Sequence, residues 1–302
     1  MKQITITKND ANQRLDKFLV KFMPLLPKSM LYKSLRKNCV RVNGKHVKDG
    51  AYMLKEGDEL SLYFKDEFFR KEEVHIGEND NIDVAYEDDN IIVVNKPAGL
   101  VVHADDKNTG DTLIARIHSY LYKKGLYDPS REQSFVPALC NRLDRNTSGL
   151  VIAAKNATAL RIINEKIKER EIKKYYLCIT EGVPPKKSDT LTSRLTRDEK
   201  KVHLSDDGEK EIVTKYRILS TDGERALLEI ELLTGRTHQI RAQMAHIGCP
   251  LEGDVKYGAS RKDGYKLCSY RLEFDFTSDA GELEYLKGKI IEIEHLKNGF
   301  FT

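Results

Sequence analysis

The sequence predicts an α+β protein, in which a small α/β module precedes a larger domain built on a mixed, largely antiparallel sheet. Its 302 residues are too many for one ordinary core and enough for two unequal domains. Basic side chains are concentrated at the start, because residues 1–64 hold 13 Lys and Arg against 6 Asp and Glu, a surplus of +7, whereas the whole chain carries +4. After residue 82, strand-like apolar runs outnumber helical ones, which is typical of an α+β domain.

Residues 1–64 predict a module of two helices and a hairpin. The run RLDKFLVKF has helical spacing, and Ser29 is expected to cap a second helix that turns Leu31 and Leu35 inward. The run CVRVNGKHVKDG alternates around Asn-Gly, a strong hairpin signal, and GDELSLYF closes the module with a strand. The basic side chains expected at its exposed edge are Lys33, Arg36, Lys37, Arg41 and Lys45. Such a basic surplus is typical of phosphate binding, and a solvated surface face is the alternative.

The larger domain is expected over residues 81–302, after a charged linker at 65–80 that has no sustained period. Its first part predicts a hairpin in IDVAYEDDNIIVVNKPAG, a buried strand in GLVIAAK and an amphipathic helix in ATALRIINEKIKER. The runs KKYYLCITEG, EIVTKYRILS and ALLEIELLTG predict three further strands. Thr237 is expected to cap a helix, HQIRAQMAHI, that ends at Gly248 and Pro250.

Composition and missing motifs argue against several classes of protein. The N-terminus has no apolar export segment, and no long uncharged apolar run follows, so we expect a cytoplasmic protein without membrane contact. The five cysteines are widely spaced and include no CxxC pair, which argues against a disulfide framework and a zinc site. The patterns GxGxxG, GxxxxGK[ST] and HExxH do not occur. We therefore expect neither a metal nor a nucleotide cofactor.

The remaining candidates for chemistry are few. Ser148 lacks the GxSxG elbow of hydrolases and is interpreted as a turn residue. His238 and His246 have no evident third ligand, so a structural or RNA-facing role is favoured over metal binding. Asp144, in CNRLDRNTSGLV, has two interpretations: a turn residue that accepts backbone hydrogen bonds, or a catalytic carboxylate. The local residues leave both open.

The N-terminal segments resemble a known RNA-binding domain. The order RLDKFL, PKSMLYKSLR, VRVNGKHV and GDEL is similar to the domain first known from ribosomal protein S4. The resemblance implies that this module positions RNA by contacting the RNA backbone, and that it performs no chemistry. The sequence departs from the family after the basic helix, where Asn38 and Cys39 stand in place of the usual glycine.

The larger domain resembles the RluA-type pseudouridine synthases, and in particular their RluC/RluD-like members. NRLDRNTSGLVIAAK is similar to their catalytic motif, and NKPAGLVVH, IKKYYLCITEG and GRTHQIRAQMAHIGCPLEGDVKYG match other blocks in order, over roughly residues 82–275. The resemblance implies the pseudouridine synthase fold and isomerisation of specific uridines in RNA, with large-subunit ribosomal RNA as the expected substrate. Transfer RNA, or a non-catalytic role in ribosome assembly, is the alternative. A monomer is expected.

The resemblance also assigns residues. Asp144 matches the nucleophilic aspartate, Tyr176 the active-site tyrosine, with Tyr175 as its rival, and Arg241 the basic partner. Arg142 matches the arginine that helps to occupy the space of the displaced uridine, and His238 is expected to contact RNA. The departures from the family pattern are Asn141 for histidine, Ala104 for proline and Cys249 for histidine.

These residue types suit the implied reaction. Pseudouridine forms when the N-glycosidic bond of uridine breaks and C5 of the turned base joins the same C1′, so no atom is gained and no cofactor is needed. Asp144 would attack C1′ or remove a C2′ proton, and the sequence leaves both routes open. Arg241 would favour the ionised form of Asp144, and Tyr176 would stack on the uracil and assist loss of the C5 proton. The nucleotide must first be flipped out, which favours uridines in structured loops.

Overall fold

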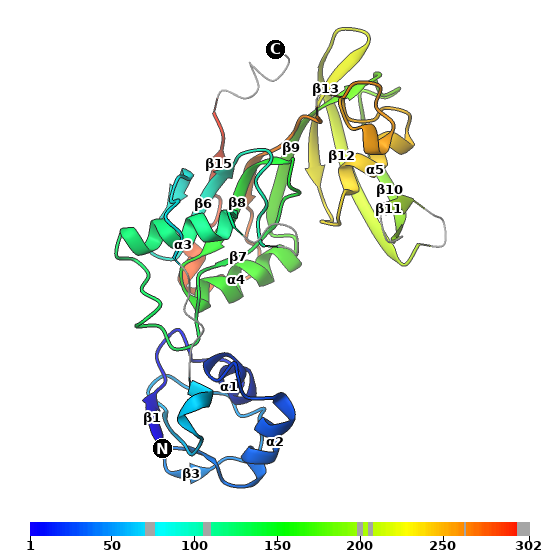
Figure 1. Ribbon diagram of the computed structural model, residues 1–302. Helices are drawn as coiled ribbons and strands as arrows, with labels where there is room; N and C mark the ends of the chain where they lie inside the picture. Colours follow the sequence, from blue (N-terminus) through cyan, green and yellow to red (C-terminus); the bar gives the residue numbers. More distant parts are fainter. Residues whose placement is uncertain (70–75, 105–109, 198–201, 205–207, 263, 295–302) are drawn as a thin grey trace.

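The computed structural model describes residues 1–69, 76–104, 110–197, 202–204, 208–262 and 264–294. Within them a small N-terminal module lies at one end of a larger sheet domain, and the molecule is elongated (Figure 1). Residues 70–75, which belong to the segment expected as a linker, are outside the described residues. None of the helices in the described ranges has the length and apolar character needed to cross a membrane.

The N-terminal module is a small antiparallel sheet packed against two helices. Its elements are β1 (Lys2–Thr5), α1 (Leu15–Phe22), α2 (Lys28–Arg36), β2 (Val40–Val42), β3 (Lys45–His46) and β4 (Glu59–Leu62), with strand order β1-β4-β2-β3. The predicted hairpin is confirmed, because Asn43 and Gly44 both have positive φ, 50° and 75°, as its two-residue turn requires. Strand β1 was not expected from the sequence.

Two details of this module differ from the prediction. Helix α2 begins at Lys28 with Pro27 in the capping position, and no side chain caps it, so the expected cap by Ser29 is wrong. The carbonyl of Pro27 already accepts hydrogen bonds from two amides of the first turn. The charged segment after residue 64 also begins with a 3₁₀ helix, Asp66–Phe69, whose Phe68 and Phe69 pack against the core of the module.

The larger domain contains a mixed sheet whose pairings are antiparallel except for β8 with β14. Its strands are β5 (Asp83–Glu87), β6 (Ile91–Lys96), β7 (Ala138–Leu139), β8 (Ser148–Ala154), β9 (Ile172–Glu181), β10 (Ser188–Arg197), β11 (Val202–Leu204), β12 (Lys210–Thr221), β13 (Arg225–Leu232), β14 (Leu267–Phe274) and β15 (Ile290–Glu292). The order along the sheet is β11-β10-β12-β13-β9-β14-β8-β6-β5, with β15 on β14 and β7 on β8. This confirms the predicted fold class. Ser148 opens β8, so its interpretation as a turn residue is wrong.

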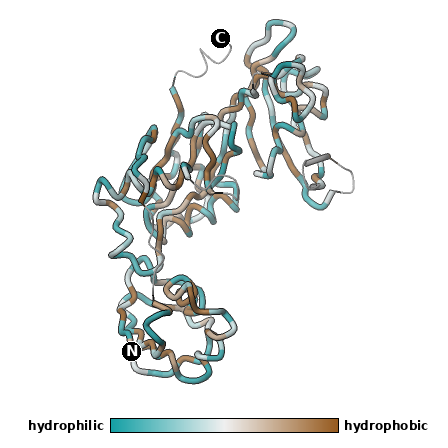
Figure 2. The backbone as a smooth tube through the Cα atoms, in the orientation of Figure 1, coloured by the Kyte–Doolittle hydropathy of each residue, from teal (hydrophilic) through white to brown (hydrophobic). Residues whose placement is uncertain are grey.

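Helices cover both faces of this sheet. They are α3 (Leu113–Lys123), α4 (Ala157–Lys168) and α5 (Gln239–His246), with short 3₁₀ helices at Val255–Tyr257 and Gly281–Leu286. Ile92 and Val94 of β6 pack in one cluster with α3 and α5, whereas Ile91 and Val93 pack in another with α4. Figure 2 shows hydrophobic residues concentrated along the central strands between these layers. The alternation of strand side chains thus builds one core on each face.

Strands β8 and β14 approach each other closely at Gly149. This residue has φ of 110°, and a Cβ atom there would lie 2.2 Å from the carbonyl oxygen of Ser269. Only glycine fits such a contact at that backbone conformation. The close crossing fixes the start of β8, and therefore the loop that precedes it.

The module contacts the larger domain through polar groups. Ser134 donates a 2.5 Å hydrogen bond to Asp10, and Arg161 of α4 donates to the carbonyl of Ala11. The two contacts come from separate parts of the larger domain, a loop and a helix. They hold the module against the end of the domain that carries α4 (Figure 1).

Candidate active site

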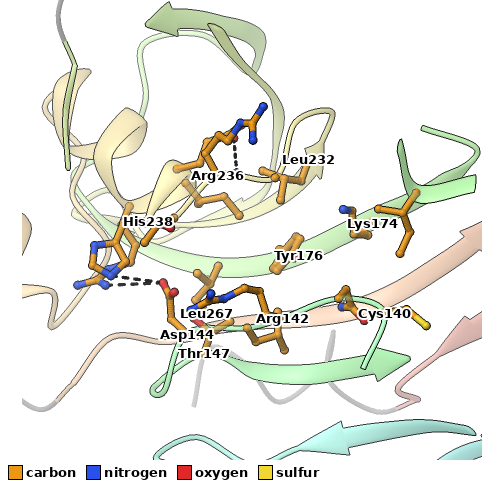
Figure 3. Close-up of a pocket in the computed structure, with 18 residues that line it drawn as sticks. Cys140, Arg142, Asp144, Thr147, Lys174, Tyr176, Leu232, Arg236, His238 and Leu267 are labelled. Carbon is orange, nitrogen blue, oxygen red and sulfur yellow. Dashed lines mark hydrogen bonds and ion pairs between the residues drawn. The ribbon is translucent and has the colours of Figure 1, made fainter. Parts of the chain in front are cut away.

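A pocket opens between the loop before β8, strand β9 and the segment that leads into α5 (Figure 3). Among the residues that line it are five of the predicted catalytic and RNA-binding residues: Arg142, Asp144, Tyr176, His238 and Arg241. They come from segments almost 100 residues apart in the chain. The five basic residues predicted for RNA binding in the N-terminal module are not part of this pocket.

The loop that carries Asp144 is held by backbone contacts. The carbonyl of Asp144 accepts a 3.1 Å hydrogen bond from the amide of Thr147. The fully buried Lys96 donates from Nζ to the carbonyls of Leu100, Arg145 and Pro97, at 2.8, 2.9 and 3.0 Å. Burial lowers the pKa of Lys96 to about 8, against the opposing effect of the Asp144 charge. Lys96 therefore ties the NKPAG segment to the residue that follows Asp144.

The carboxylate of Asp144 faces two basic side chains without a direct hydrogen bond. Its Oδ2 lies 3.7 Å from Nε2 of His238 and 3.9 Å from Nη1 of Arg241, and 26% of its side chain is exposed. In the part of the chain that the structure describes, this carboxylate accepts no hydrogen bond from the turn around it, unlike a turn-forming aspartate. It is thus positioned by its backbone and open toward the pocket.

Arg241 is fixed by a different carboxylate. Its Nε and Nη2 bond the two oxygens of Asp254 at 2.6 and 2.8 Å, a bidentate geometry that is strong and specific. Its guanidinium also lies 4.3 Å from the ring centre of Tyr265 and 4.9 Å from that of Tyr257. Arg241 was expected as the partner of Asp144, and the shorter contacts are those to Asp254. Asp254 and Tyr257 lie in the block GDVKYG, and neither was predicted as a site residue.

His238 lies beside Asp144 because of an unusual backbone conformation. It has φ of 55°, in the left-handed region, and occupies the capping position of α5, which begins at Gln239. The expected cap by Thr237 is wrong, because His238 occupies the capping position and no side chain caps the helix. Nδ1 of His238 lies 3.0 Å from the hydroxyl of Tyr257. Burial lowers the pKa of His238, which favours the neutral imidazole at pH 7.

Tyr176 forms the wall of the pocket on β9. Its side chain is buried, and burial raises its pKa to about 12, so the phenol stays protonated at neutral pH. Tyr175 belongs to another cluster, where the guanidinium of Arg271 lies 4.8 Å from its ring centre. Strand alternation thus separates the two tyrosines, and only Tyr176 lines the pocket.

Two residues that depart from the family pattern, Asn141 and Cys249, have structural roles. Oδ1 of Asn141 accepts a 2.8 Å hydrogen bond from the amide of Ile152, so this side chain braces the loop against β8. Cys249 is buried in the core below α5. Arg142 is exposed at the mouth of the pocket.

Across the described ranges, no three His, Cys, Asp or Glu side chains come together in a way that could hold a metal ion.

The fold and this site define a class: an enzyme with a carboxylate and an arginine in a pocket, preceded by a basic module. The model of the RNA pseudouridylate synthase family matches residues 90–246, and that of the S4 domain matches residues 13–60. This chain belongs to the RNA pseudouridylate synthase family. It is an isomerase that acts on uridine in RNA, and its N-terminal module is an S4 domain.

Similar proteins cover most of the chain. An uncharacterized RNA pseudouridine synthase of Mycoplasma capricolum is 32% identical, over 96% of this chain and 97% of that protein. The ribosomal large subunit pseudouridine synthase C of Escherichia coli is 35% identical, over 85% of this chain and 80% of its own length. The structure of human RNA pseudouridylate synthase domain containing 1 has the same fold, with a TM-score of 0.54 at 22% identity, over 68% of this chain and 83% of that one.

Proposed function

We propose that this enzyme converts specific uridines of large-subunit ribosomal RNA into pseudouridine, with Asp144, Tyr176 and Arg241 as its catalytic residues. The observation that carries the proposal is the position of the Asp144 carboxylate beside two basic side chains. It is held within 4 Å of Arg241 and His238, makes no direct hydrogen bond to either, and lines the pocket. The ribosomal substrate is supported by the 35% identical synthase of Escherichia coli, whose name gives that activity.

Each residue has a role that follows from its surroundings. The ribose of the flipped uridine lies at Asp144, which attacks C1′ or removes a C2′ proton, and both routes need an ionised carboxylate without a bonded partner. Arg241 supplies a fixed positive charge that favours that ionised form. The ring of Tyr176 stacks on the uracil, and Arg142 at the mouth fills the space that the flipped nucleotide leaves in the RNA.

The S4 domain holds the RNA outside the pocket. Lys33, Arg36 and Lys37 are exposed on and just after α2, and within the described residues no carboxylate oxygen lies within 4.0 Å of their charged groups. Lys45 is exposed on the neighbouring hairpin, and Arg41 packs its guanidinium over the ring of Tyr63. These charges are therefore available to phosphate groups. We further propose a monomer, and a ribosomal substrate supports a cytoplasmic location.

Neutralising the basic helix is expected to weaken RNA binding and its dependence on salt. The variant Lys33→Gln/Arg36→Gln/Lys37→Gln removes three cations, and each phosphate contact contributes roughly 0.7 to 0.9 to the log–log salt slope. The slope, measured by titrating RNA binding at several salt concentrations, should fall by about 2 to 3. A matched variant, Lys168→Gln/Lys287→Gln on the side of the sheet that α4 covers, should keep it. An unchanged slope in the triple variant would show that α2 does not contact RNA.

The activity itself is tested on unmodified RNA. Purified protein, with no added metal or nucleotide, is expected to form pseudouridine at discrete positions of a large-subunit ribosomal RNA transcript, detected by site mapping. Transfer RNA transcripts serve as the comparison, and the same sites should lack pseudouridine in a deletion strain. Conversion confined to transfer RNA would contradict the proposed substrate. Activity abolished by EDTA and restored by zinc would contradict the proposed chemistry.

A further inference from the structure

A further basic side chain, Lys174, lies in the pocket beyond Tyr176. It precedes Tyr176 by two residues on β9, so both side chains project from the same face of the strand, and both line the pocket. Its Nζ approaches the segment before α5, because a Cβ atom at Gly235 would lie 3.5 Å from it. Figure 3 shows Tyr176 between Asp144 and Lys174.

The charge of Lys174 has no counterpart among the residues that the structure describes. Within the described ranges its Nζ has no carboxylate within 4.0 Å and no hydrogen-bond acceptor, and burial alone lowers its pKa. The fully buried lysines of the described ranges are compensated: Lys96 bonds three carbonyls, and Lys166 pairs with Glu171 at 2.7 Å. Its neighbour Lys173 pairs with Asp275 at 2.7 Å. Lys174 is half-buried, and a cation that is partly withdrawn from water without a protein partner is unfavourable, so a ligand that brings an acceptor to this position would be stabilised.

The order of groups along the pocket indicates which part of the substrate meets Lys174. If the ribose lies at Asp144 and the uracil ring on Tyr176, the side of the ring opposite N1, which carries a carbonyl oxygen, would point toward Lys174, because Tyr176 lies between Asp144 and Lys174. When the N1–C1′ bond breaks, its electron pair stays on the uracil, and the negative charge spreads over N1, O2 and O4. The C5–C1′ bond then forms, C5 loses one proton and N1 gains one, so the atoms balance.

A single fixed hydrogen-bond donor can contact the uracil before and after the base rotates. Rotation of uracil about the line through N3 and C6 exchanges N1 with C5, and it exchanges O2 with O4. A donor that meets one carbonyl oxygen before the rotation therefore meets the other afterwards. Such a donor stabilises the detached base both before and after its rotation.

We propose that Lys174 is a further catalytic residue, whose ammonium binds a carbonyl oxygen of the uracil ring and stabilises the negative charge on the detached base. This inference rests on the proposed roles of Asp144 and Tyr176. It adds a contact that acts on the base, at the opposite end of the pocket from the carboxylate that acts on the sugar.

The test compares Lys174→Met with Lys174→Arg, and uses Lys173→Met on the other face of β9 as the matched control. Single-turnover rates are measured with saturating enzyme on a ribosomal RNA fragment, together with RNA affinity and thermal melting. Lys174→Met should slow turnover by about 100-fold, as expected for loss of one donor to developing charge. Its RNA affinity and melting temperature should stay near wild type, because an uncompensated charge has been removed. Lys174→Arg should recover part of the rate, and Lys173→Met should keep it.

The other outcomes separate competing roles. A Lys174 that binds phosphate would lose RNA affinity in the Met variant, with a salt slope lower by roughly 0.7 to 0.9 and a normal saturated rate. If Lys174 had only a structural role, Lys174→Met would lower the melting temperature, and Lys174→Arg would not recover the rate. Either result would overturn the inference. Turnover of Lys174→Met within threefold of wild type, while Asp144→Asn is inactive, would overturn the role of Lys174 alone. An active Asp144→Asn would instead overturn the proposed function.

Discussion

Asp144→Asn is expected to fold and bind RNA almost as wild type does, yet to form essentially no pseudouridine. The substitution keeps the shape of the side chain and removes the charge that both proposed routes require. The fold should tolerate it, because the loop is held by the carbonyl of Asp144 and by Lys96, and the carboxylate makes no hydrogen bond to the turn in the described structure. A loss of about 5 kcal/mol of transition-state stabilisation slows turnover by about four orders of magnitude.

Single-turnover conversion of a ribosomal RNA fragment measures this effect, with RNA affinity and thermal melting as companions. Asp222→Asn is the matched control, since Asp222 is a turn aspartate whose Oδ1 accepts from the amides of Glu224 and Arg225 at 3.0 and 2.7 Å. That variant is expected to keep its turnover. Should Asp144→Asn retain turnover within tenfold of wild type, Asp144 would be a turn residue like Asp222, and the proposed chemistry would fail.

Arg241→Met is expected to lose both activity and stability. Turnover should fall by about 10³-fold, because the fixed charge near Asp144 is removed. The free energy of unfolding should fall by about 3–5 kcal/mol, because Asp254, whose side chain is 2% exposed, is left as a buried charge without its bidentate partner. Turnover is therefore measured well below the melting temperature of the variant.

A second substitution separates the two losses. In Arg241→Met/Asp254→Leu both charges of the buried pair are gone, so stability should return toward wild type while turnover stays low. Arg241→Lys keeps a charge but cannot bond Asp254 bidentately, and is expected to give intermediate turnover. If the double variant regained activity together with stability, Arg241 would act only by holding the fold.

Strong local patterns predicted much of the fold. The alternation around Asn43-Gly44 and the helical spacing of Leu160, Ile163 and Ile167 each gave the right element, since these signals depend on neighbouring residues only. Helix α3 was not predicted, although Leu113, Ile117 and Leu121 follow a helical period. Strand β10 was also missed, because SDTLTSRLTR is polar and owes its conformation to pairing with β12.

From the sequence, the motif around Asp144, with Tyr176 and Arg241 in later blocks and a basic module ahead of them, was enough to predict the family and to propose its catalytic residues. Such motifs can be recognised in the sequence because each is a short continuous stretch of the chain. The partners of these groups became known from the three-dimensional fold, which sets Asp254 against Arg241 and gives Lys174 no acceptor among the described residues. Pairing and burial depend on contacts between segments far apart in the chain, and no local pattern records them.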